Sequence, residues 1–410
     1  MNNNIRGKTF AEKMNLLKLA QEYATPLYVY DGDLIRQKYH ELLAYFPYPI
    51  KLFYAMKANF NKDILKLLLD TGASIDAVSP AEVLLALEIG FPKEKILFTA
   101  NRTTEEEMKL VYDLGILCNV GSLSQLKKFG AAHPTSRVCI RLNPMVVAGE
   151  NELVSTAGEN SKFGIPLDKK RELLDIIKTY SLTVVGIHEH TGSGIPETVH
   201  MKQGVKNILA ILDKKSFPDL EFIDFGGGFK VSYRPNEKAV DYVLFGKEMG
   251  EIFSTFCTAH GKELDMYFEP GKFLVAEAGT LLVTVTDLVT TKNKILAGVN
   301  SGFPQLIRPM FYGAYHHIRN ITHPNGEEKT YDVVGNICES GDCFATDRNI
   351  PEIHEGDILS IETAGAYCYS MGGNYNLRPM PAEVLVLDEK VSLVTRRITH
   401  AELAGSVLDV

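Results

Sequence analysis

Two short segments carry side chains that could together bind an aldehyde and draw electrons away from it. Lys57 lies in the otherwise apolar stretch YAMKAN, and a lysine held among apolar and cationic neighbours has a depressed pKa and can attack a carbonyl carbon to form a Schiff base. Glu269 stands in the rigid turn EPGK, where its carboxylate could face the nitrogen of an aromatic ring and keep that nitrogen protonated. Taken singly, each residue could instead be a solvated surface group.

Two glycine-bearing segments could hold a phosphate and a flat ring. The triple glycine 226–228 in DFGGGF would let backbone amides point at an anion, although a tight turn alone would also explain it. In HEHTGSG, Ser193 could cap a phosphate and His190 could stack on a ring. His188 lies on the same side of the expected strand as His190, which would also suit a metal, but no third ligand is suitably spaced. One of the two histidines is therefore expected to pack in the core.

Two later segments could act on a substrate. CESGD (338–342) combines a thiol with two carboxylates, so Cys338 could be a proton donor, a nucleophile or buried filler. Arg308 could be a surface cation or could clamp a carboxylate through two parallel hydrogen bonds.

Strands and helices alternate between about residues 50 and 270. The expected strands are 51–55, 73–77, 96–98, 117–120, 138–142, 184–188, 221–225 and 265–268. The expected helices are 62–71, 80–90, 104–114, 122–132, 168–180, 198–214 and 241–260, with starts at Ser79 before Pro80 and at Thr103 before the 105–107 acidic run. Eight such units in series favour an α/β fold with a closed parallel (β/α)8 barrel over a doubly wound open sheet.

The barrel hypothesis also predicts where function lies, because the active sites of such barrels sit at the C-terminal ends of the strands. Polar and glycine-rich positions recur at those ends: Lys57, Asp76, Arg141, 190–193, 226–228 and 269–271. The long loop 145–163 after the fifth strand is expected to be a lid or a pocket wall.

The chain changes character after about residue 275. Runs such as LLVTVTDLV, DILSIE and AEVLVL have turn residues between them and little helical period, which indicates a mostly antiparallel β-domain. The early segment 26–31 is also strand-like, which predicts that it pairs with that sheet. We therefore expect a barrel over 32–275 and a β-domain made of 1–31 plus 276–410.

Composition restricts the class of protein. The 410 residues carry a net charge of −8 with dispersed Lys and Arg, which argues against nucleic acid or an anionic membrane surface as a partner. The first ten residues show no secretory signal, and no apolar run reaches the ~18 residues that a membrane span needs. The six cysteines form no CxxC pair, so reduced thiols and a cytoplasmic location are expected.

Taken together, the motifs resemble those of the fold-type III pyridoxal-phosphate-dependent decarboxylases, the group that acts on ornithine, diaminopimelate and arginine. YAMKAN, HEHTGS, GGG, EPG, CESGD, GAY (365–367) and NYNLRPMPAEV follow one another in the family's order from about residue 25 to 390. SKFGI, IRPMFYGAYH and AGAYCYSM are similar to the diaminopimelate-decarboxylating members. The resemblance implies an alanine-racemase-like fold and a lyase that uses pyridoxal 5′-phosphate to convert meso-2,6-diaminopimelate to L-lysine and CO2, the last step of lysine biosynthesis.

The resemblance also implies a role for each matching residue. Lys57 would bind the cofactor aldehyde with help from Asp76, His190 would stack on the ring, Glu269 would pair with the ring nitrogen, and Ser193, Gly226, Gly227 and Gly228 would bind the phosphate. Arg308 and Tyr312 would hold the distal carboxylate of the substrate, Glu339 its distal amino group, and Tyr367 would lie between phosphate and substrate. Cys338 would donate a proton from a second subunit, which implies a homodimer with shared sites.

One departure from the family concerns the turn at 269–272. The family usually reads EPGR, and that arginine touches the phosphate and substrate region next to Gly271. Lys272 keeps the charge but loses the bidentate fork.

Three alternatives remain at this point. A decarboxylase for ornithine, lysine or a carboxylated polyamine would not need the Arg308–Tyr312 clamp. A racemase of the same fold would tolerate a cation where Glu269 stands. An inactive regulatory relative would be expected to lose Lys57, Glu269 or Cys338, and all three are present.

Overall fold

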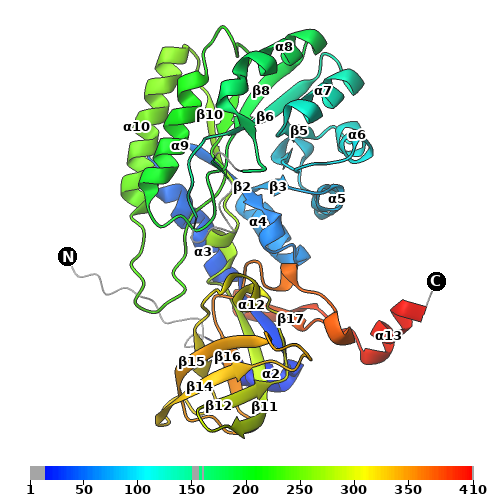
Figure 1. Ribbon diagram of the computed structural model, residues 1–410, viewed down its shortest axis with the longest axis vertical. Helices are drawn as coiled ribbons and strands as arrows, with labels where there is room; N and C mark the ends of the chain where they lie inside the picture. Colours follow the sequence, from blue (N-terminus) through cyan, green and yellow to red (C-terminus); the bar gives the residue numbers. More distant parts are fainter. Residues whose placement is uncertain (1–13, 150–156, 159–160, 409–410) are drawn as a thin grey trace.

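A closed barrel of eight parallel strands forms the larger part of the protein (Figure 1). The computed structural model describes residues 14–149, 157–158 and 161–408. The barrel strands are β2 (Ile50–Ala55), β3 (Ser74–Ala77), β4 (Ile96–Phe98), β5 (Leu117–Val120), β6 (Arg137–Asn143), β8 (Thr183–His188), β9 (Phe222–Asp224) and β10 (Asp265–Phe268). The pairing of β10 with β2 closes the ring, so the closed barrel is confirmed and the open sheet is excluded. The strands are mostly buried and rich in apolar residues, because both faces of a parallel barrel are covered.

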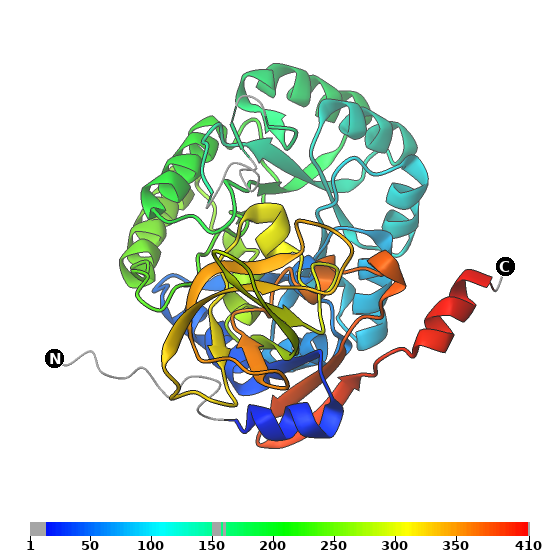
Figure 2. The same ribbon diagram turned by 60° about the horizontal axis from the view of Figure 1, so that its bottom comes forward.

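The helices predicted from amphipathic stretches surround this barrel (Figures 1 and 2). They are α4 (Lys62–Thr71), α5 (Pro80–Ile89), α6 (Glu105–Asp113), α7 (Leu123–Ala132), α8 (Lys170–Tyr180), α9 (Thr198–Ile211) and α10 (Tyr242–His260). Ser79 caps α5 as predicted. The cap of α6 is Thr104, so the prediction of Thr103 was wrong by one residue; Thr104 and Glu107 bond each other's backbone in a capping box.

A second, mixed sheet lies across one end of the barrel (Figure 2). Its strands are β1 (Leu27–Asp31), β11 (Gly279–Thr290), β12 (Ile295–Val299), β13 (Ile318–Asn320), β14 (Glu328–Val334), β15 (Cys343–Pro351), β16 (Ile358–Ile361), β17 (Ala382–Leu387) and β18 (Lys390–Thr395). β1 lies between β11, to which it is antiparallel, and β17, to which it is parallel. On this arrangement we propose domain boundaries after residues 31 and 275.

The remaining elements connect or extend these two parts. They are α2 (Leu16–Tyr23), α3 (Gly32–Ala44), β7 (Ile165–Pro166), α11 (Lys272–Val275), α12 (Arg308–Tyr312), α13 (His400–Leu408) and single turns of 3-10 helix that include η1 (Met56–Ala58) and η6 (Tyr375–Leu377). None of the described helices is long and apolar enough to cross a membrane.

The second sheet is held against the C-terminal edge of the barrel by backbone contacts. The amide of Tyr367 donates to the carbonyl oxygen of Ala58 at 2.8 Å, and that of Gly365 donates to Ala276 at 3.0 Å. One continuous apolar core includes residues of both parts, such as Phe268 in the barrel and Leu281 in the sheet. The edge where functional residues were expected is therefore covered by the second sheet.

Candidate active site

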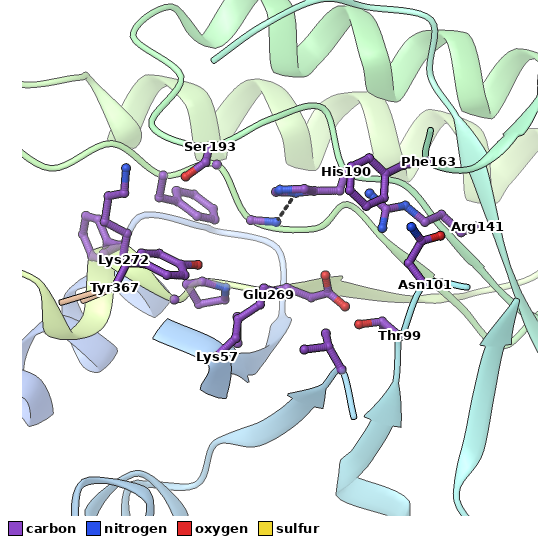
Figure 3. A pocket seen from close by; sticks show the side chains of 18 of the residues that line it. Lys57, Thr99, Asn101, Arg141, Phe163, His190, Ser193, Glu269, Lys272 and Tyr367 are labelled. Carbon is purple, nitrogen blue, oxygen red and sulfur yellow. Dashed lines mark hydrogen bonds between the residues drawn. The ribbon is translucent and has the colours of Figure 1, made fainter. Parts of the chain in front are cut away.

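A cavity of about 500 Å³ lies where the barrel's C-terminal edge meets the second sheet (Figure 3). Both parts contribute to its lining. Of the residues singled out in the sequence, it is lined by Lys57, Arg141, His190, Ser193, Gly227, Gly228, Glu269, Gly271, Lys272, Arg308, Tyr312 and Tyr367.

Lys57 stands in the turn η1 directly after β2, and Asp76 is the last residue but one of the neighbouring strand β3. Lys57 Nζ donates to Asp76 Oδ2 at 2.7 Å, and Asp76 is fully buried and also accepts from the Thr99 hydroxyl. Burial lowers the pKa of Lys57, but the charges of Asp76, Tyr367 and Glu269 outweigh it and raise that pKa above its usual value. The expectation of a depressed pKa was therefore wrong, because the nearest charged neighbour is an acid and not a cation.

Glu269 directly follows β10 and lines the cavity between Lys57 and Thr99 (Figure 3). Its Oε2 lies 2.9 Å from His188 Nε2, and its carboxyl group also adjoins the buried carboxyl group of Asp224. Burial raises the pKa of Glu269, while Lys57, Arg141 and a hydrogen bond with Asp224 lower it. Burial holds the pKa values of His188 and His190 well below their usual value, so both rings are neutral. His188 is buried and does not line the cavity, so it is the core residue of the pair.

His190 is fixed by the glycine turn after β9. The amide of Gly227 donates to His190 Nδ1 at 3.0 Å, as Figure 3 shows, and the amide of Gly226 donates to Asp224 Oδ1 at 2.8 Å. Two of the three glycine amides are thus engaged inside the protein. A Cβ on Gly227 would lie 2.5 Å from the Glu269 carbonyl oxygen, and Gly228 has a φ of +100°, so the turn needs glycine for close approach and for conformation.

The end of the cavity away from Arg141 carries arginine, lysine and tyrosine side chains. Arg308 begins α12, is 2% exposed, and its Cζ lies 4.5 Å from the centre of the Tyr233 ring. Lys272 begins α11, is buried, and places Nζ 5.8 Å from the same ring. In Figure 3, Lys272, Tyr367 and Ser193 lie at one end of the cavity, and Arg141 and Asn101 lie at the other.

Four of the residues for which the family resemblance implies a role do not line this cavity. Asp76 lies behind Lys57, and Gly226 lies behind His190. Cys338 and Glu339 are exposed on the surface after β14. The backbone amide of Cys338 donates to Asn376 Oδ1 at 2.8 Å, which fixes this segment at the surface of its own chain.

Comparison with known proteins assigns this cavity to a family. Residues 32–276 match the family described as "Pyridoxal-dependent decarboxylase, pyridoxal binding domain". The chain belongs to the pyridoxal-dependent decarboxylases. The matched range contains the whole barrel and the strand ends that line the cavity.

Within this decarboxylase family, similar proteins are diaminopimelate decarboxylases. The enzyme of that name from Methanothermobacter thermautotrophicus is 40% identical over 98% of this chain and 95% of its own length. A crystal structure of diaminopimelate decarboxylase has a TM-score of 0.90 at 33% identity and covers 99% of both chains. A second, from Helicobacter pylori and complexed with L-lysine, has a TM-score of 0.86 at 32% identity and covers 96% of this chain and 100% of its own.

The residues around the decarboxylase cavity fit a pyridoxal group. Lys57 offers an amine, and Glu269 places a buried carboxyl group in the lining of the cavity. A buried carboxylate is costly unless a donor or a cation pairs with it, and a protonated ring nitrogen would do so. The flat face of His190 and the hydroxyl of Ser193 also line the cavity.

Several lining residues were missed by sequence reasoning. Thr99 and Asn101 follow β4, and Phe163 stacks under Arg141 with a 4.8 Å distance from the Arg141 Cζ to the ring centre. The rule that barrel sites lie after strand ends would have found Thr99 and Asn101. Phe163 belongs to the 145–163 loop, which was expected to form a lid or wall; residues 150–156 and 159–160 of that loop lie outside the described residues.

Proposed function

We propose that this decarboxylase uses pyridoxal 5′-phosphate to remove one carboxyl group from meso-2,6-diaminopimelate, giving L-lysine and CO2. The observation that carries this proposal is that Lys57 shares one cavity with Arg308 and Tyr312. A guanidinium can bind a carboxylate through two parallel hydrogen bonds, so a substrate held at Lys57 by one end could be held at its other end by a second carboxylate.

The barrel residues would hold the cofactor. Lys57 would bind its aldehyde, Glu269 would face its ring nitrogen, and His190 would pack against its ring. Ser193, the amide of Gly228, Gly271 and Lys272 would hold its phosphate, while Gly226 and Gly227 shape the turn. When bound, pyridoxal 5′-phosphate supplies an electron sink for the bond that breaks between the α-carbon and the carboxylate.

The protein's own groups would then control charge and protons. Glu269 would keep the proton on the ring nitrogen, because its buried carboxylate stabilises a positive charge beside it. Asp76 would hold the Lys57 amine in place after the amino group of the substrate has displaced it. The second sheet would exclude water from the cavity, and Tyr367 would separate the phosphate region from the substrate.

Cys338 and Glu339 would act in the cavity of a second copy of the chain. They are exposed in their own chain, and around them lie exposed apolar side chains: Met310 (43% exposed), Phe311 (54%), Tyr375 (51%) and Leu377 (49%). An apolar patch of this kind is typical of a protein interface. In the homodimer that we propose, Cys338 Sγ would donate a proton to the α-carbon, and Glu339 would bind the distal amino group.

A mixed-dimer experiment tests the shared site. Lys57→Ala and Cys338→Ala chains are each expected to be inactive, and co-assembly should restore roughly a quarter of the wild-type sites, because half of the dimers then contain one intact pair. Absence of recovery in dimers of verified mixed composition would exclude the shared site.

We also propose a cytoplasmic location. All six cysteines are free, as is usual for proteins of a reducing compartment.

The activity itself is tested by release of CO2 and lysine. The purified protein with added pyridoxal 5′-phosphate should act on meso-diaminopimelate and not on L,L-diaminopimelate, D-lysine or ornithine. Turnover of ornithine with none of diaminopimelate would retain the decarboxylase and overturn the proposed substrate.

A further inference from the structure

His316 lies fully buried beside Arg308, the residue proposed to hold the second carboxylate. Its Nε2 is 3.0 Å from Arg308 Nη1, and its Nδ1 is 2.9 Å from the backbone oxygen of Glu362. The imidazole therefore links the guanidinium to the main chain at the end of β16.

The two contacts dictate which nitrogen of His316 carries hydrogen. A backbone carbonyl only accepts hydrogen bonds and a guanidinium only donates them. Nδ1 must therefore be protonated and donate to Glu362, and Nε2 must be bare and accept from Arg308. Burial and the charge of Arg308 lower the pKa of His316 to about 3, so the ring stays neutral and the acceptor persists.

The local chain path explains how a residue eight positions later returns to Arg308. α12 ends at Gly313, whose φ is +62°, and the amide of Ala314 donates to the Arg308 carbonyl oxygen at 3.3 Å. The amide of Glu362 in turn donates to the His317 carbonyl oxygen at 2.8 Å. The pairing of β13 with β16 thereby fixes both ends of the link.

Tyr233 supports the guanidinium from the barrel side. Besides lying under Arg308, its ring is 5.4 Å from the His316 ring at 78°, an edge-to-face contact. Tyr233 belongs to the loop after β9, whereas Arg308 and His316 belong to the second part of the chain. The guanidinium is thus held between the two parts that form the cavity.

We propose that neutral His316 is the positioning residue that aims Arg308 at the second carboxylate of the substrate, and so sets the preference for substrates that have one. This deepens the proposed function and rests on it. A neutral acceptor occupies one of the five N–H donors of Arg308 and adds no negative charge. An aspartate or glutamate in that place would compete with the substrate for the same cation.

The test uses two ligands that differ in that carboxylate. L-lysine carries it and cadaverine, the same chain without it, does not, and both can be titrated into the holoenzyme by calorimetry. His316→Phe keeps a flat ring against Tyr233 but removes both hydrogen bonds, and His316→Gln restores an acceptor and a donor. His317→Phe is the matched control, since His317 is half-buried next door and bonds Tyr315 instead.

We expect His316→Phe to weaken L-lysine binding and to raise the KM for diaminopimelate roughly 10- to 100-fold, as for the loss of a hydrogen bond to a charged group. Cadaverine binding and kcat should change little, His316→Gln should recover part of the loss, and His317→Phe should match the wild type. Equal weakening of both ligands, or a fall in kcat at unchanged KM, would overturn the positioning role. The calorimetric titration does not depend on turnover. If the wild type binds L-lysine selectively but does not decarboxylate diaminopimelate, only the proposed reaction is refuted. A wild type that binds L-lysine no better than cadaverine would refute the clamp and the role of His316 with it.

Discussion

His188 Nε2 lies 2.9 Å from Glu269 Oε2, and both side chains are buried, Glu269 in the lining of the cavity and His188 behind it. The pKa of His188 is held well below its usual value by burial and by Arg141, so the ring is neutral. A neutral histidine that donates to a carboxylate orients it without cancelling its charge. The contact therefore fixes the direction of the Glu269 carboxyl group, including its second oxygen, Oε1.

The first prediction concerns that oxygen. Glu269→Gln keeps the shape of the side chain and removes its charge, so the ring nitrogen of a bound cofactor would lose the group that keeps it protonated. We expect kcat to fall about 10²- to 10³-fold, as for the loss of a preorganised electrostatic partner. Steady-state kinetics measures this, with Glu221→Gln, which breaks a surface ion pair with Arg137, as a control of unchanged kcat. A fall of less than threefold would mean that Glu269 does not serve the ring.

The second prediction concerns Lys57 and Asp76. Asp76 raises the pKa of Lys57 against the lowering effect of burial, so Asp76→Asn should leave burial dominant and lower that pKa. The amine would then be neutral at lower pH and react with an aldehyde there. Reductive trapping of pyridoxal by the cofactor-free protein across pH 6 to 10, a range below the raised pKa of the wild type, should therefore be faster at each pH in Asp76→Asn. Asp70→Asn, which removes an exposed partner of Lys66, should match the wild type; slower trapping in Asp76→Asn would contradict the assignment.

Periodicity was sufficient to predict the barrel and its edge. All eight barrel strands and seven helices were located because apolar runs and amphipathic stretches alternate regularly, and the site follows from the rule for strand ends. The helix α3 (Gly32–Ala44) was not predicted, since it precedes the first barrel strand and falls outside that alternation.

Electrostatic detail could not be predicted in the same way. The direction in which the pKa of Lys57 is shifted depends on Asp76. Asp76 is 19 positions away and adjoins Lys57 only through the pairing of β2 with β3. The backbone amides of the glycine turn were expected to point at a phosphate. Those of Gly226 and Gly227 instead donate to the side chains of Asp224 and His190. Such contacts are properties of the folded arrangement and have no periodic signature.

A third prediction follows from Lys272, which stands where the family usually has arginine. Lys272→Met keeps an apolar stem against Tyr233 and removes the charge, so the affinity for pyridoxal 5′-phosphate should fall roughly tenfold or more. Lys272→Arg should retain it. Equilibrium dialysis of the cofactor measures both variants, and Lys292→Met, on an exposed turn before β12, is the control. If Lys272→Met leaves the affinity for the cofactor unchanged, the Lys272 ammonium group serves the substrate and not the phosphate of the cofactor.

The last prediction uses Glu189, a carboxyl group buried between the two histidines of the HEH segment. Burial raises its pKa to about 8, although Thr191 Oγ1 donates to it at 2.9 Å and Arg141 lies near. In the unfolded chain this group titrates near its ordinary value of about 4.3. Between the two pKa values the folded state holds a proton that the unfolded state has lost, so stability falls as pH rises through that window, by up to about 1.4 kcal/mol per pH unit.

Glu189→Gln abolishes this titration. Its free energy of unfolding, measured in urea from pH 5 to 10, should therefore decline less steeply than that of the wild type below about pH 8, and the two curves should run parallel above it. Exposed Glu251→Gln should follow the wild type throughout, whereas equal slopes for Glu189→Gln and the wild type below pH 8 would show that the buried carboxyl is already ionised there.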